Sequence, residues 1–168
     1  MRKQLVALAL TAGLWTGIAS AQTTYEAFLS GSKEVPANGS TATGFGTVTL
    51  NAAQTQITVD ESWTGLSAPA SASHIHGPAG IGTNAPILFP FAGVPAATSG
   101  SIPEQVFNVT PTQVGYLQSG LLYMNVHDST FPGGEIRGQL TLVPEPGTWA
   151  LFGLGGLGLA WVMRRRAK

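Results

Sequence analysis

Apolar residues in the central part of this chain alternate with polar ones instead of recurring at helical spacing. In residues 44–51, Val48 and Leu50 fall on one face while Thr47 and Thr49 fall on the other. The same period of two recurs in three further stretches, residues 56–63, 121–127 and 135–142. Successive side chains of a strand point to opposite faces, so the pattern predicts antiparallel strands with one buried face.

Turn-forming residues separate these stretches. Clusters of Gly, Pro, Asn and Ser occur at short intervals and mark tight turns or loops. One short helix is predicted from Thr110 as N-cap, Pro111 as first helical residue and Gly120 as terminator. Many short strands with one short helix predict an all-β fold, either an antiparallel β-sandwich or a Greek-key barrel.

The start of the chain has the layout of an export signal. Arg2 and Lys3 precede an apolar run that reaches residue 18, and small residues follow as far as Ala21. A basic start, a short apolar run and a small-residue cleavage site are typical of a signal peptide. We predict a signal peptide over residues 1–21 that signal peptidase removes, so that the mature chain begins at Gln22.

The other end combines three features in a fixed order. Residues 149–163 are apolar and uncharged, and as a helix they would cover about 22 Å, less than the ~30 Å hydrocarbon core of a membrane. A Pro-Glu-Pro tripeptide precedes this stretch and an arginine cluster follows it: Pro144, Glu145, Pro146, and Arg164, Arg165, Arg166. We expect residues 144–168 to form a short transmembrane helix with a basic cytoplasmic end.

This tail resembles the PEP-CTERM sorting signal of Gram-negative bacteria. The resemblance implies recognition by an exosortase, transient anchoring in the inner membrane, and delivery to the cell surface or an exopolysaccharide matrix. Before the exosortase removes the tail, the protein would touch a membrane only through it. An ordinary C-terminal anchor is the alternative, and in either case the domain works outside the cytoplasm.

The segment between these ends, residues 22–143, has the length of one compact domain. It contains two basic and seven acidic residues, which give a net charge near −5 although the whole chain is formally neutral. An acidic domain without a basic stripe argues against nucleic acid as a partner. The chain also contains no cysteine, which excludes disulfides, thiol catalysis and zinc-thiolate sites.

Four blocks of this segment resemble the CHRD domain, a module of chordin and of many secreted bacterial proteins. The blocks occur in the order of the family: FLSGSKEVPA at residues 28–37, ATGFGTVTL at 42–50, SHIHGPAG at 73–80 and YMNVHDSTFPGGEIRGQL at 123–140. The resemblance implies an immunoglobulin-like or dismutase-like β-sandwich of Greek-key type. A fold of this kind does not by itself define a biochemical function.

The three histidines of the chain are the candidate ligands of a metal ion. His74 and His76 are two residues apart, so on a strand both rings point to the same face. His127 ends another predicted strand, and if the two strands are neighbours, three imidazoles converge in a way that suits zinc or copper. Asp128 or Glu135 would then complete the set with an oxygen ligand.

The same region also allows a structure without metal. The histidines, Asn125, Glu135 and Arg137 would form a buried polar network that joins two loops by hydrogen bonds, in which the carboxylate beside the guanidinium is a bidentate partner for a loop or terminus. From the residues alone, both interpretations remain open.

Two functions follow from these alternatives. The first is an exported, non-catalytic module that acts in binding or structure at the envelope or in the matrix. The second is a copper or zinc domain that uses His74, His76 and His127, with redox activity as an option. A dismutase with two metal ions is disfavoured, because three histidines cannot fill both sites.

Overall fold

The computed structural model describes residues 21–144 of the 168-residue chain. The predicted signal peptide and the predicted C-terminal helix lie outside these residues, apart from Ala21 and Pro144 at the boundaries. Within residues 21–144, no helix has the length and apolar character that a membrane span requires. The strands and helices of this part have the following bounds: β1 (Thr23–Ser30), η1 (Gly31–Lys33), β2 (Thr43–Leu50), β3 (Gln56–Thr64), β4 (Ala70–His76), β5 (Ile87–Pro90), β6 (Gly100–Ser101), β7 (Gln105–Asn108), α1 (Pro111–Gln118), β8 (Tyr123–Asp128), β9 (Ile136–Gln139) and β10 (Thr141–Leu142).

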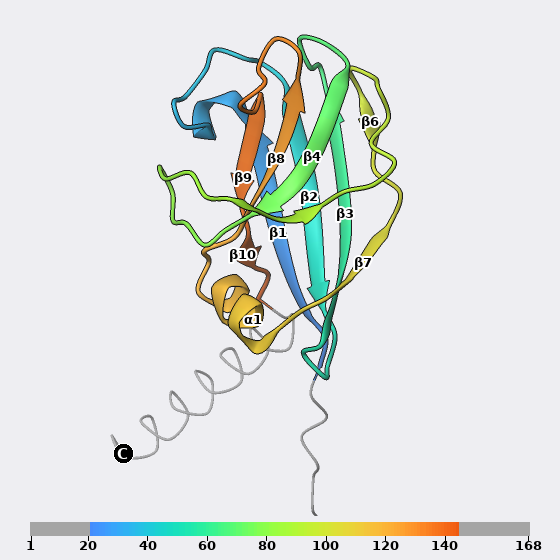
Figure 1. Ribbon diagram of the computed structural model, residues 1–168, viewed down its shortest axis with the longest axis vertical. Helices are drawn as coiled ribbons and strands as arrows, with labels where there is room; N and C mark the ends of the chain where they lie inside the picture. Colours follow the sequence, from blue (N-terminus) through green and yellow to red (C-terminus); the bar gives the residue numbers. More distant parts are fainter. Residues whose placement is uncertain (1–20, 145–168) are drawn as a thin grey trace, which may run out of the picture.

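The strands form one antiparallel sheet that curls into a half-barrel (Figure 1). Their order is β5-β4-β8-β9-β1-β2-β3-β6, while β10 pairs with β1 and β7 pairs with β3. The two halves of this sheet join where β9 meets β1, through the single residue pair Ser30 and Arg137. The all-β antiparallel fold with one short α-helix is therefore confirmed.

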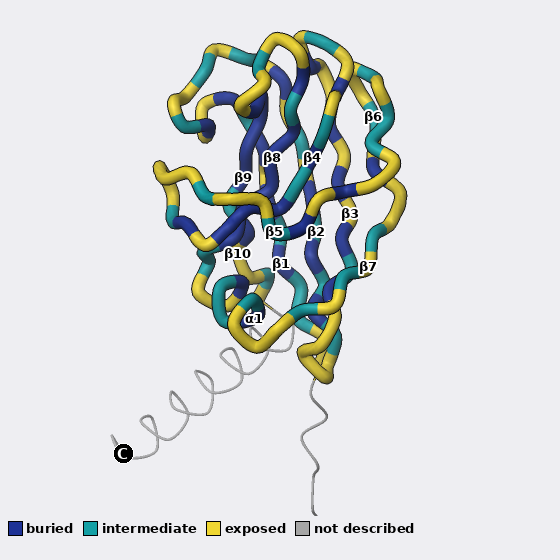
Figure 2. Tube along the Cα trace, viewed as in Figure 1, coloured by how far each residue is buried: buried dark blue, intermediate teal, exposed yellow. Residues whose placement is uncertain are grey.

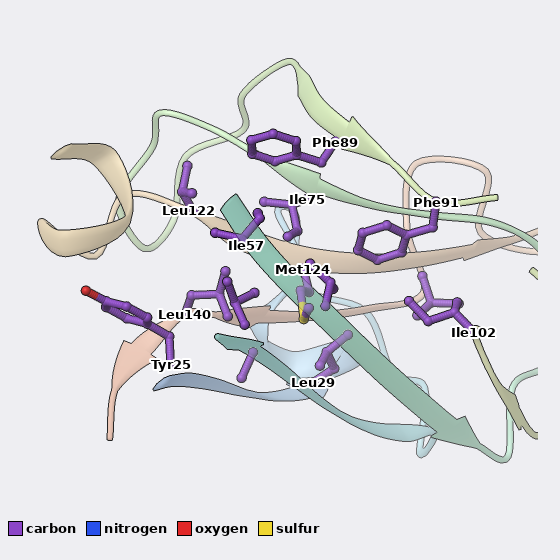
Figure 3. Packing of buried hydrophobic residues seen from close by; sticks show 14 of the residues in the cluster. Tyr25, Leu29, Ile57, Ile75, Phe89, Phe91, Ile102, Leu122, Met124 and Leu140 are labelled. Atoms are coloured by element: carbon purple, nitrogen blue, oxygen red, sulfur yellow. The ribbon is translucent and has the colours of Figure 1, made fainter. Parts of the chain in front are cut away.

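The two halves face each other across the apolar core (Figure 3). Met124 of β8 projects toward β2, where a side chain on Gly46 would collide with its sulfur atom. Phe89 of β5 and Phe107 of β7 bring the other ends of the halves together, with ring centroids 5.2 Å apart. The alternation in the sequence therefore marks the inner face of each half correctly.

The helix α1 begins and ends where the sequence predicts. Thr110 accepts a hydrogen bond from the backbone N–H of Gln113, and the Gln113 side chain accepts one from the backbone N–H of Thr110. This capping box satisfies two N–H groups that the first turn leaves free. Gly120, just beyond the helix, has a φ of 66°, which a residue with a side chain adopts only at a cost.

One acidic residue lies inside the core between the two halves. Glu61 of β3 is only 2% exposed, because it occupies an inward position in the alternation of that strand. Its Oε2 atom bonds to the hydroxyl of Ser73 on β4, which also bonds to the carbonyl oxygen of Asn125 at 3.0 Å. A hydroxyl has one proton to donate, so both bonds form together only when Glu61 is protonated and donates.

Burial raises the pKa of Glu61 to about 7, although a hydrogen bond that Ser73 donates to the ionised carboxylate offsets part of this effect. Because the pKa is higher in the folded than in the unfolded protein, the folded protein binds more protons. Stability is then lost as the pH rises from about 4.5 to about 7.

Replacing Glu61 by Gln should remove this dependence, because an amide does not ionise. At pH 5 we expect similar free energies of unfolding for Glu61→Gln and the wild type. At pH 8 the variant should be more stable by up to about 3 kcal/mol. Urea unfolding of both proteins at the two pH values measures this, and an equal difference at both would contradict a buried, titrating Glu61.

β9 and β1 lie very close together where the two halves join. A Cβ atom on Gly138 would lie 2.7 Å from the carbonyl oxygen of Phe28, and this oxygen belongs to the backbone. A backbone atom cannot turn aside as a flexible side chain can. Glycine at position 138 therefore permits the contact that joins the halves.

Gly138→Ala should destabilise the protein by about 1–3 kcal/mol, the usual cost of overpacking. The matched control is Gly115→Ala in α1, where a Cβ atom meets nothing within 4 Å. That change should stabilise the helix by up to about 1 kcal/mol. Thermal and urea unfolding compare the two variants, and equal effects would show that the close approach of β9 and β1 contributes nothing.

Candidate metal centre

The register of β4 against β8 brings the three histidines to one face of the sheet. His76 lies opposite Tyr123, and His74 lies opposite Asn125. His127 is two positions along from Asn125, which makes it the diagonal neighbour of His74 on the same face. The predicted convergence of the three rings therefore occurs, on the outer side of the β4–β8 pair.

The ring nitrogens are close enough to share one ion. One ligand atom from each histidine can be chosen so that all three lie within 4.8 Å of one another. The closest two are Nδ1 of His74 and Nε2 of His127, which are 3.1 Å apart. The ring centroid of His74 is 5.4 Å from that of His76 and 4.9 Å from that of His127.

Backbone carbonyl groups orient two of the rings. Nδ1 of His76 is 3.0 Å from the oxygen of Ala85, and Nδ1 of His127 is 3.0 Å from the oxygen of Pro132. A carbonyl oxygen only accepts, so each Nδ1 carries the hydrogen and each Nε2 offers a lone pair. Nε2 of His76 is buried and has no hydrogen-bond partner within residues 21–144. Metal-binding histidines are commonly oriented in this way.

All three imidazoles are held in the neutral form that binds metals. Burial, together with the neighbouring His127 and His76, lowers the pKa of His74 to about 4. Burial also lowers the pKa of His76, against the hydrogen bond to Ala85, and that of His127, against the hydrogen bond to Pro132. No proton then has to be displaced from the rings at neutral pH.

A loop, residues 77–86, packs over this outer face beside the histidines. The ring of Tyr123 stacks on His76 with centroids 4.9 Å apart, and its hydroxyl accepts a hydrogen bond from the backbone N–H of Ala85. Arg137 lies 3.4 Å from the centroid of the Tyr123 ring. Figure 2 shows β8 and β9 buried along most of their length, because the core covers one face and loops cover the other.

Neither carboxylate that was expected to complete the metal site joins the histidines. Asp128 follows His127 directly, so it points to the opposite face of β8 and accepts hydrogen bonds from the backbone of Ala68 and Phe131. Glu135 accepts from the backbone N–H and the hydroxyl of Ser67. The cluster within residues 21–144 is made of imidazoles alone.

The expected polar network is divided among separate partners. Asn125 donates to Glu34 over 2.6 Å, and the guanidinium of Arg137 donates to the side chain of Asn84 and to the carbonyl of Thr83. Glu135 accepts from the backbone N–H of Ser67 through both of its carboxylate oxygens, as expected of a carboxylate that holds a loop, and within residues 21–144 it is not bonded to Arg137. The reason is that Glu135 precedes β9 and turns toward the loop at residue 67, whereas Arg137 lies on the outer face.

Sequence reasoning missed the groups that orient the histidines. Ala85 and Pro132 act through their carbonyl oxygens, which every residue type has, so no side-chain pattern indicates them. The hydrogen bond that Asn125 donates to Glu34 was also missed, because it depends on a loop that returns to β8 from a distant part of the sequence. Burial raises the pKa of Glu34 to about 7, while Asn125, Arg137 and a backbone hydrogen bond lower it.

Comparison with known families gives two matches. A model of the CHRD domain matches residues 25–140, which is more than half of the chain. A model of the PEP-CTERM protein-sorting motif matches residues 142–166. Comparison with curated proteins and with solved structures gives no match.

The histidines should titrate well below the ordinary value in the metal-free protein. We expect His74 to remain neutral down to a pH near 4, and the other two rings to titrate below 6.5. Their protonation favours the unfolded chain, so their contribution to stability should be lost as the pH falls below 6.5. An NMR titration of each ring measures this, and a ring that titrates at 6.5 or above would contradict the buried cluster.

Proposed function

The chain belongs to the CHRD domain family, and we propose that it is a non-catalytic module that binds one transition-metal ion through His74, His76 and His127. Its PEP-CTERM motif implies export by a Gram-negative bacterium and processing of the C-terminal segment by an exosortase. The proposal places the mature domain at the cell surface or in the extracellular matrix.

The observation that carries the proposal is the orientation of the ring nitrogens. Nε2 of His76 is buried without a partner, and Nε2 of His127 faces a nitrogen of His74. An unpaired buried polar atom costs about 1–3 kcal/mol, and a bound ion would remove this cost. Two nitrogens that bind one zinc ion in tetrahedral geometry are about 3.3 Å apart, close to the 3.1 Å between His74 and His127. The widest separation, 4.8 Å, requires that binding draws the rings together.

The ligand set favours zinc or copper among the common metal ions. Neutral imidazole suits both, whereas magnesium and calcium prefer carboxylate and carbonyl oxygens. Three histidines leave a fourth position for water or another ligand. The proposed role is non-catalytic. Turnover of a substrate in a reaction that depends on His76 would contradict this part of the proposal.

A structural role without metal is the second function that a specific observation favours. Nδ1 of His74 and Nε2 of His127 are within hydrogen-bond distance, so the two rings can bond to each other directly. His76 and His127 also attach two loops to the sheet through Ala85 and Pro132. In this alternative the cluster holds the loops in place and takes no ligand.

Metal analysis distinguishes the two roles. The exported protein, purified without a histidine tag and loaded with zinc or copper(II), should retain about one equivalent. Its thermal midpoint should rise with the concentration of the ion, because only the folded protein has the site. A stoichiometry near zero after loading would leave the structural role.

His74→Gln is the most selective variant, since the hydrogen bond of this ring is to His127 and not to a loop carbonyl. We expect it to lose the bound equivalent and the rise of the thermal midpoint, while the metal-free stability changes little. Glu104→Gln, at an exposed position, is the control for non-specific binding. Equal metal retention by both variants would contradict the site.

A further inference from the structure

The positive charges of the domain lie together at one cavity. Lys33 and Arg137 are the only lysine and arginine within residues 22–143, a segment that also contains seven acidic residues. Both line a cavity of about 240 Å³ at the junction of β1 and β9. The two residues are 104 positions apart in the sequence, so it is the fold that places them at the same cavity.

The surroundings of Arg137 leave its charge poorly compensated. Its side chain is 2% exposed, and its guanidinium donates to the oxygens of Asn84 and Thr83, both of which are neutral acceptors. The carboxyl group of Glu34 acts on it electrostatically, but burial raises the pKa of Glu34 to about 7. A buried cation with incomplete compensation favours an anionic ligand. A guanidinium has five N–H donors, so donors remain for such a ligand.

An exposed aromatic pair lies beside this cavity. Phe28 is 58% exposed and Phe45 is 39% exposed, and their ring centroids are 5.1 Å apart. They are opposite each other in the register of β1 and β2, on the outer face of the sheet. Phe28 lines the cavity that holds the two cations, and Phe45 lines a second cavity of about 200 Å³. The rings therefore form a bridge between the two cavities.

The second cavity differs in charge from the first. Asp60, Ser62 and Ser101 contribute to its lining, and they supply a carboxylate and two hydroxyl groups. An anionic group would be repelled there by Asp60, whereas a neutral group with hydroxyls would find hydrogen-bond partners. The surface thus has an anion-binding end, an apolar middle and a polar end that carries a carboxylate and hydroxyl groups.

We propose that this surface binds a polysaccharide in which uronic acid units are joined to neutral sugars. The carboxylate of one unit takes the cavity of Lys33 and Arg137, where charge-assisted hydrogen bonds favour it. The C–H faces of the sugars pack on Phe28 and Phe45, because apolar C–H surface is favourable against an exposed aromatic ring. A neutral unit lies against Asp60 and the two serines. A flat lipid surface would not reach into both cavities, which is why a polymer fits better.

Binding of a hyaluronan hexasaccharide, in which glucuronate alternates with N-acetylglucosamine, tests the proposal. Calorimetry or NMR on the exported protein in the presence of a chelator makes the result independent of the metal centre. We expect saturable binding that weakens with added salt. Chitohexaose, which is neutral, and free glucuronate should each bind at least about tenfold more weakly.

Variants assign the binding to this surface. Lys33→Gln should weaken it about tenfold, while Lys33→Arg should restore it, since the cation is kept. Phe28→Ser should weaken it similarly, and the matched control is Val106→Ala, which truncates an apolar side chain 57% exposed on β7. Far-UV circular dichroism confirms that each variant folds.

Three outcomes would overturn the proposal. The first is no binding of the hexasaccharide. The second is equal affinity for free glucuronate, which would indicate a simple carboxylate site. The third is binding of phosphatidylglycerol vesicles in place of the hexasaccharide with the same loss in Lys33→Gln, which would indicate a lipid surface as the partner.

Discussion

The pairing of β4 with β8 is the constraint on which the rest of the structure depends. Ile75, Met124 and Val126 on the inner face of this pair are completely buried, and burial of each such side chain stabilises the fold by about 1.5–3 kcal/mol. A shift of one strand by one residue would expose its apolar side chains and turn its histidines inward. The apolar core on the inner face therefore holds the imidazoles of the outer face in position.

The outer face of the same half is polar but not open to solvent. Loops cover it, and their backbone groups bond to the side chains beneath, as Ala85 does with His76 and Tyr123. Covering the rings removes water from them, and this desolvation keeps them neutral. The packing of a loop over the rings therefore lowers their pKa values. The guanidinium of Arg137, stacked on Tyr123, connects this face to the cavity at the junction of β1 and β9.

Some of this could be predicted because it depends on local rules. The period of two identified the strands, and the Thr110, Pro111 and Gly120 pattern located α1. The spacing of His74 and His76 fixed their common face. The expected oxygen ligand was wrong because Asp128 follows the alternation of β8 to the opposite face, and because Glu135 lies before β9 and bonds to the loop at Ser67.

Sequence by itself determined the class of fold, the C-terminal sorting motif, the family and the face on which each strand residue lies, because these depend on period, composition and short motifs. Only the tertiary structure decided which strands are neighbours, and therefore that His127 lies beside His74 and that Lys33 and Arg137 line one cavity. It also decided that the carboxyl group of Glu61 lies between the two halves of the sheet. These contacts join residues that are far apart in the chain. They follow from the order of the strands in one curled sheet, and no local sequence pattern indicates that order.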